Sequence, residues 1–89
     1  MSQVDADIEI KKEEPLVNLK TGEKGRVMYL SSMCRGPERQ RLIALGVLPG
    51  TVIQVEMASP FGDPVAYRIR DAVIGLRKEQ AQLIRVIPL

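Results

Sequence analysis

The chain has 89 residues, enough to bury one compact core but too few for two domains. Hydrophobic residues make up 45% and charged residues 27%, as in ordinary globular proteins, while aromatic residues make up only 3%. The formal net charge of +2 divides into −3 for residues 1–14, where two lysines face five acids, and +5 for the rest. Rings for stacking bases are scarce and basic runs are lacking, so a nucleic-acid partner is not expected.

The chain contains no histidine and a single cysteine, Cys34, which lies in a polar stretch expected to form a loop over residues 31–36. Without histidine, no Ser–His or Cys–His pair can form, and one cysteine excludes an intramolecular disulfide. Metal sites favour clusters of Cys, His and carboxylates, whereas Cys34 has only Glu38 near it in sequence. Met28 and Met33 are interpreted as core residues. We therefore expect no catalysis, no cofactor and no specific metal site.

The acidic N-terminus does not resemble a signal peptide, and no apolar stretch approaches the roughly 20 residues that span a bilayer. A single cysteine also suits a reducing compartment. We therefore expect a cytoplasmic protein with no direct membrane insertion. Residues 1–14 are expected to be a charged, flexible extension, with an alternating strand through Val4, Ile8 and Ile10 as the alternative. Residues 15–89 then form the domain.

The first half of the domain is expected to contain one strand and one helix. Leu16 and Leu19 indicate an apolar turn that closes one end of the core, and residues 26–30 indicate a strand. Pro37 suits the first position of a helix, which is predicted over residues 37–45.

The helix is predicted to end at Gly46, in a left-handed cap against which Val47 packs. Pro49 and Gly50 follow at the two central positions of a type II turn. The backbone geometry explains Gly46, Pro49 and Gly50, so we interpret these three residues as structural.

The second half is predicted to form antiparallel strands that each have one buried face, since apolar and polar residues alternate over 51–58 and 64–70. Further strands are predicted over 72–76 and 83–87, with a short helical turn over 78–81. Eight residues are predicted to form the core: Leu42, Leu45, Ile53, Val55, Ile69, Leu76, Ile84 and Val86. About five short strands and one inserted helix predict a small, mainly β barrel, because closure protects sheet edges.

Three stretches together resemble the FeoA family. Arg41–Thr51 resembles its Arg-Leu-x-x-Leu-Gly-x-x-Pro-Gly-Thr motif, and Pro60–Pro64 and Leu76–Ala81 match a hairpin and a closing motif in the same order. The resemblance covers about residues 15–88 and implies an SH3-like barrel. One departure is Asp71, which stands with Ala72 where the family commonly has glycine in a tight turn; aspartate tolerates the left-handed conformation.

The resemblance implies an accessory role in ferrous iron uptake, as a protein-binding adapter or regulator of the iron permease FeoB through its cytosolic region. The alternative is a peptide-binding regulatory module related to the C-terminal domain of metal-dependent repressors. A third class, a nucleic-acid-binding small barrel, would need phosphate contacts for which the sequence has no basic run. A weak homo-oligomer is left open.

Three residues are candidates for partner binding. Phe61 is the only phenylalanine and lies between two prolines at a hairpin tip, where a side chain is seldom buried. Aromatic anchors dominate binding energy at interfaces, so Phe61 is the leading candidate. Arg41 and Arg77 either lie over apolar surface or pair with a carboxylate, or they frame a groove for a partner.

Overall fold

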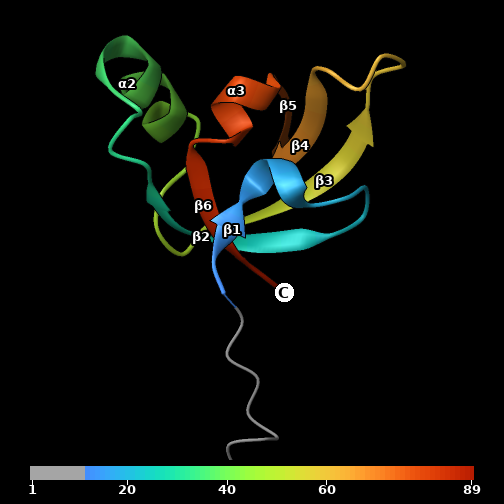
Figure 1. Cartoon of the computed structure of the whole chain (residues 1–89), viewed down its shortest axis with the longest axis horizontal. Coiled ribbons are helices and arrows are strands. Elements are labelled where there is room, and N and C mark those ends of the chain that lie inside the picture. Colours follow the sequence, from blue (N-terminus) through green and yellow to red (C-terminus); the bar gives the residue numbers. More distant parts are fainter. Residues whose placement is uncertain (1–11) are drawn as a thin grey trace, which may run out of the picture.

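A computed structural model describes residues 12–89 and shows one antiparallel sheet curled into a small barrel, with two helices along one edge (Figure 1). The elements in chain order are β1 (Glu14–Pro15), η1 (Leu16–Asn18), β2 (Lys24–Leu30), α2 (Gly36–Ala44), β3 (Val52–Ala58), β4 (Val65–Ile69), β5 (Ala72–Leu76), α3 (Lys78–Ala81) and β6 (Ile84–Pro88). The strand order is β1-β6-β2-β3-β4-β5. The alternating residues Val4, Ile8 and Ile10 lie outside the described residues.

The sheet has six strands rather than about five, because Glu14 and Pro15 pair with β6. This strand begins within the segment assigned to the N-terminal extension. Glu13, just before it, accepts a hydrogen bond from the Tyr29 hydroxyl at 2.5 Å and lies 3.9 Å from Arg85 Nε. The mainly β class and both helices are confirmed, with α2 displaced by one residue from its predicted range.

The core lies inside the curled sheet and is closed by η1 and the two helices. Seven of the eight predicted core residues are buried; Leu45 is the exception, since it is only half-buried and lies outside the buried cluster. Leu45 is the C-cap of α2, where the chain leaves the helix. The apolar contact comes instead from Leu42 and, after the chain reverses, from Val47.

Two β-bulges change which side chains face the core. In β2 the register shifts between Val27 and Tyr29, and in β3 between Val55 and Met57. An extra residue reverses the alternation of a strand, so side chains beyond it point to the other face. Tyr29 is therefore 46% exposed, and Met57, which the simple alternation placed on the same face as Val55, is 64% exposed. Met28, the extra residue of the β2 bulge, was interpreted as a core residue but is 44% exposed.

The loop after β2 also differs from expectation. Cys34 was expected in a polar loop but is 2% exposed and belongs to the core, whereas Met33, interpreted as core, is 69% exposed. The Cys34 N–H donates to the Ser31 carbonyl at 2.9 Å, so the chain turns back within a few residues. This turn directs one of the two adjacent sulfur side chains inward and the other outward.

The exit of α2 is a Schellman motif, as the sequence predicts. The Gly46 N–H donates to the Ile43 carbonyl at 2.9 Å, and the Val47 N–H donates to the Leu42 carbonyl at 3.0 Å. Gly46 has φ 103°, in the left-handed region. The Schellman motif therefore ends the helix and turns Val47 into the core.

The next turn is closed by a hydrogen bond from the Thr51 N–H to the Leu48 carbonyl at 3.0 Å, with Gly50 at φ 94°. These are the features of the predicted type II turn. The turn leads directly into β3.

The β4–β5 hairpin has a two-residue loop, Arg70–Asp71, closed by the pair Ile69 and Ala72. The left-handed residue in this loop is Arg70, with φ 58°, and not Asp71 as expected. The Arg70 side chain lies against Gly46, where a Cβ would meet its Nε at 2.9 Å. The hairpin tip is thus in contact with the exit of α2.

Replacing Gly46 by valine is expected to lower the free energy of unfolding by about 1 kcal/mol or more, because a β-branched residue resists a positive φ. The new side chain would also approach Arg70, but that long side chain can move aside. Urea denaturation measures the loss, and adding Arg70→Ala should recover little of it. Full recovery of the free energy of unfolding would show that crowding by Arg70, and not backbone conformation, is the reason that this position requires glycine.

Replacing Gly25 by alanine is expected to destabilise the fold by roughly 1–3 kcal/mol, as overpacking of a core does. A Cβ at Gly25 would lie 2.9 Å from both Leu19 Cδ1 and Val86 Cγ2. Gly75→Ala is the matched control in the same sheet, since its Cβ would meet only Pro64 Cβ, at 4.0 Å. Equal thermal unfolding of the two variants would contradict this account.

Candidate docking surface

Three parts of the chain that are distant in sequence lie along one edge of the barrel. Figure 1 shows α2, α3 and the loop between β3 and β4 in a row on the side opposite the C-terminus. We call this row, formed by residues 36–44, 77–81 and 59–64, the docking edge. Each of the three stretches that resemble the FeoA family contributes to it. Tertiary folding therefore brings these separate motifs onto one surface.

Side-chain hydrogen bonds join the three parts. Asp63 in the loop accepts the backbone N–H of Lys78 through Oδ1 at 3.0 Å, at the start of α3. Gln80 uses both ends of its amide: Oε1 accepts the Arg77 N–H at 2.9 Å, and Nε2 donates to Glu38 Oε2 of α2 at 2.8 Å. The loop is thus tied to α3, and α3 to α2. The sequence analysis did not identify Asp63, Gln80 or Glu38 in these roles. The bonds of Asp63 and Glu38 join residues whose proximity depends on the fold, whereas the Arg77–Gln80 bond is a local helix cap that the three-residue spacing could have indicated.

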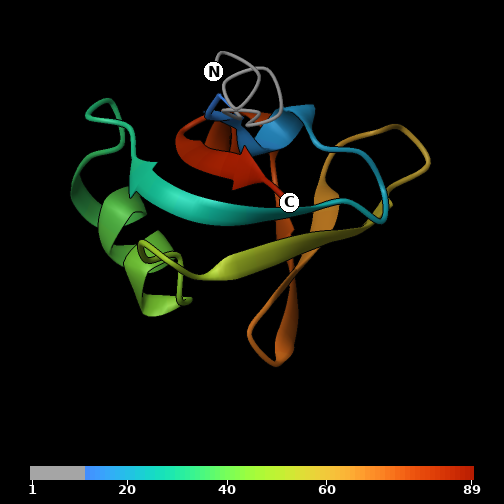
Figure 2. The same ribbon diagram turned by 90° about the horizontal axis from the view of Figure 1, so that it is seen from below.

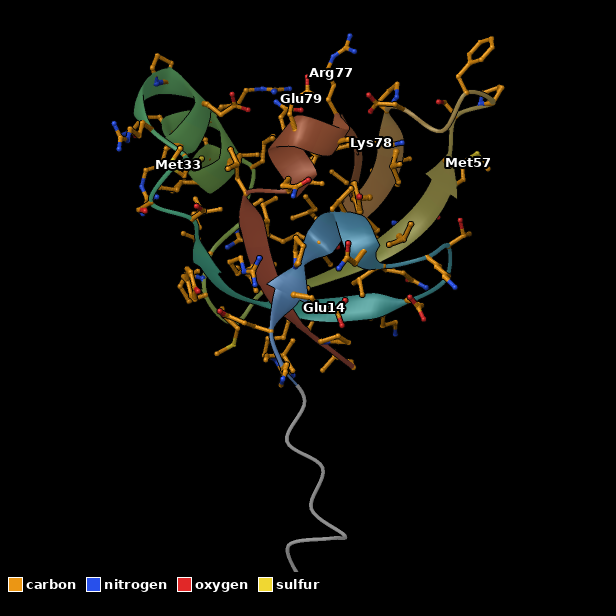
Figure 3. All side chains as sticks on the ribbon, viewed as in Figure 1. Glu14, Met33, Met57, Arg77, Lys78 and Glu79 are labelled. Atoms are coloured by element: carbon orange, nitrogen blue, oxygen red, sulfur yellow. The ribbon has the colours of Figure 1, made fainter. Side chains whose placement is uncertain are left out.

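The three candidate contact residues are spread along this edge. Phe61 is 93% exposed at the tip of the loop. Arg77 precedes α3, and Figure 3 shows its side chain projecting outward from the molecule. Arg41 is exposed on α2, at the other end of the row. Within residues 12–89 neither arginine forms an ion pair. The three residues belong to the three parts of the docking edge but do not form a single cluster, and their role in binding remains a prediction.

An open hollow of about 650 Å³ lies beside the docking edge, between the end of β2 and the start of α2. Its lining residues are Tyr29, Leu30, Ser32, Cys34, Arg35, Gly36 and Arg39. Arg35 Nε donates to the Ser32 carbonyl at 3.3 Å, and Arg39 Nη1 donates to the Cys34 carbonyl at 3.4 Å. Each guanidinium keeps further N–H donors, so two cations with remaining donors line the hollow beside apolar side chains such as Leu30. The sequence signal for it was the pair of arginines at positions 35 and 39, which the sequence analysis did not use.

The Cys34 thiol is poorly suited to nucleophilic or metal chemistry. Burial raises its pKa, the neighbouring Glu38 carboxylate adds to the rise, and Arg39 opposes it. The thiolate, which is the nucleophile and metal ligand, is therefore scarce at neutral pH. No three His, Cys, Asp or Glu side chains of the described part of the chain are grouped closely enough to hold a metal. Across residues 12–89 no helix is long and apolar enough to cross a membrane.

The fold is shared with several solved structures. A FeoA-like protein from Clostridium acetobutylicum has a TM-score of 0.79 at 30% identity, over 90% of this chain and 91% of that one. FeoA of Stenotrophomonas maltophilia, solved with zinc and called a procaryotic SH3 domain protein, has a TM-score of 0.69 at 20% identity, over 80% and 86% of the two chains. A manganese-dependent transcriptional repressor has a TM-score of 0.73 at 22% identity, over 96% of this chain and 46% of that one. The last two likenesses are of fold alone.

Sequence comparison gives the family. The chain is 37% identical over 71 residues to an Fe(2+) transport protein A/Fe(2+) transporter FeoB fusion protein of Porphyromonas gingivalis. That match spans 80% of this chain and 8% of the relative. The family model for the FeoA domain matches residues 14–88, which include every strand and helix described above. The SH3-like barrel and the resemblance noted in the sequence are both confirmed, and the chain belongs to the FeoA domain family.

Proposed function

We propose that this chain is a cytoplasmic accessory protein of ferrous iron uptake that binds the cytosolic region of a FeoB permease through its docking edge and does no catalysis. The observation that supports this most strongly is the joining of loop, α3 and α2 by Asp63 and Gln80. A surface held in one arrangement loses little conformational entropy when a partner binds.

The fused relative supports the choice of partner. In the Porphyromonas gingivalis protein a Fe(2+) transport protein A part and a FeoB part occur in one chain. Fusion keeps two modules at high effective concentration, which is useful when they act together. We infer that the present chain makes the corresponding contact with a FeoB permease.

The exposed aromatic residue and the exposed cations of the docking edge have different roles in binding. Phe61 offers a large apolar side chain that is 93% exposed, as an anchor for a pocket of the permease needs to be. Arg77 and Arg41 are exposed cations without ion pairs among the described residues, so they are available to acidic groups of the partner. Rim charges of this kind act mainly on the rate of association.

Phe61→Ala is expected to weaken binding to the permease's cytosolic domains by roughly thirtyfold, about 2 kcal/mol, and to reduce iron uptake in cells. Calorimetric titration of the two purified proteins measures the affinity, after circular dichroism shows that the variant is folded. The matched control is Leu89→Ala, which removes another exposed apolar side chain at the opposite end of the barrel (Figure 1). Equal affinity of the folded Phe61→Ala variant and the parent would place the contact elsewhere.

Arg41→Glu and Arg77→Glu are expected to slow association, most at low salt, because they replace attraction by repulsion at the rim. Stopped-flow mixing at two ionic strengths measures the association rate of each variant and of the parent. Association rates equal to those of the parent at both ionic strengths, in both variants, would remove both arginines from the interface.

Ferrous iron is expected to bind the isolated protein weakly or not at all, since iron is the cargo of the permease and the buried Cys34 thiol is the chain's only one. Anaerobic calorimetry with ferrous iron tests this directly. A stoichiometric micromolar site would overturn the expectation, and its loss in Cys34→Ser would locate the site.

A further inference from the structure

We propose that two copies of this chain pair through the outer edge of β5, so that the sheet continues across a twofold axis. β5 is the last strand in the sheet order and is hydrogen-bonded to β4 on one side only. Figure 2 shows the β4–β5 hairpin extending from the body of the domain. A free strand edge is a template for pairing with another chain. The proposal goes beyond the docking function and uses a different part of the molecule, apart from Arg77.

The hairpin register determines which backbone groups of β5 are free. Its two-residue loop is closed by Ile69 and Ala72, and hydrogen-bonded pairs alternate with unbonded ones along an antiparallel ladder. Ala72, Ile74 and Leu76 therefore bond to β4, while the N–H and C=O groups of Val73 and Gly75 point away from it. In the described residues, no turn or loop hydrogen bond uses those groups. Both residues are exposed, Val73 at 50%.

One antiparallel register satisfies these groups symmetrically. With the twofold axis at Ile74, Val73 of each copy lies opposite Gly75 of the other, and both pairs exchange their backbone hydrogen bonds. The side chains fit the same register. A Cβ at Gly75 would meet nothing nearer than Pro64 Cβ at 4.0 Å, so no side chain of this chain obstructs Val73 of the second copy where it lies beside Gly75.

Charge complementarity favours this register over its neighbour. It places Asp71 of one copy opposite Arg77 of the other, twice by symmetry, and opposite charges across a strand pair are stabilising. Both side chains are exposed and form no ion pair within residues 12–89. Shifting the strands to set Gly75 against Gly75 would instead bring Asp71 opposite Glu79, a repulsive pair.

The register also sets Arg70 opposite Lys78, but neither side chain follows the strand. Arg70 is turned back within its own chain to lie against Gly46, and Lys78 already belongs to α3. Because the paired segment is short, we expect a weak dimer with a dissociation constant on the order of 0.1 mM.

Sedimentation velocity from about 10 µM to 1 mM tests the proposal, with the parent shifting from monomer to dimer across the range. Gly75→Pro should abolish the shift, because proline removes the N–H of residue 75 that points toward the second copy and breaks no hydrogen bond to β4. Asp71→Arg and Arg77→Asp should each weaken dimerisation at least tenfold, and the double variant, which swaps the charges, should restore it. Glu79→Lys, a charge change in α3 whose opposite position in this register is the uncharged, buried Ile69, is the matched control.

Hydrogen exchange gives an independent readout. The amides of Val73 and Gly75 should exchange more slowly as concentration rises, while that of Phe61 in the distant loop should not change. The proposal is overturned if the parent stays monomeric throughout. It is equally overturned by a dimer that neither Gly75→Pro nor either single charge reversal affects. Phe61→Ala leaves this surface untouched, so failure of the docking proposal and failure of the dimer are distinguishable.

Discussion

The close approach of β6 to Gly25 is the constraint on which the rest of the barrel depends. At Gly25 the β2 backbone carries no side chain, and the space where a Cβ would lie is taken by Leu19 and Val86. This contact lets β6 lie between β2 and β1, so the last strand of the chain closes the sheet against the first. Because α3 directly precedes β6, the position of β6 also determines where α3 can lie.

The docking edge follows from that placement. Once α3 is held by β6, a single glutamine reaches both its own first turn and α2, and an aspartate in the β3–β4 loop bonds the same helix. None of these bonds is strong alone, since a net hydrogen bond contributes about 1 kcal/mol. Their effect is geometric, because they set the spacing between an exposed aromatic tip and the cations on the two helices. Arg77 lies where this edge meets the end of β5, so binding of the permease and pairing of two copies would compete for it.

The sequence analysis predicted correctly the helix caps, turns and strand alternation that depend on neighbouring residues in the chain. Gly46 and Gly50 mark backbone positions that few other residues occupy, and the alternation in the strands located most of the core. The errors arose where tertiary contacts decide. A bulge is a property of a strand pair and not of one strand, so the outward turn of Met57 was invisible in its own sequence. The hollow near Arg35 was missed for the same reason, since it exists only where the end of β2 meets the start of α2.

The cysteine is buried and two methionines are exposed, the reverse of what the sequence analysis expected. This arrangement has a consequence for oxidative chemistry. Cys34 is enclosed in the core with its thiol held protonated, whereas Met33 and Met57 lie on the surface at opposite ends of the molecule (Figure 3). Oxidants attack accessible sulfur and thiolate first, and they convert methionine to a polar sulfoxide that reductases can reverse. Reactive oxygen species formed near ferrous iron would therefore alter reversible surface positions and leave the packed interior intact.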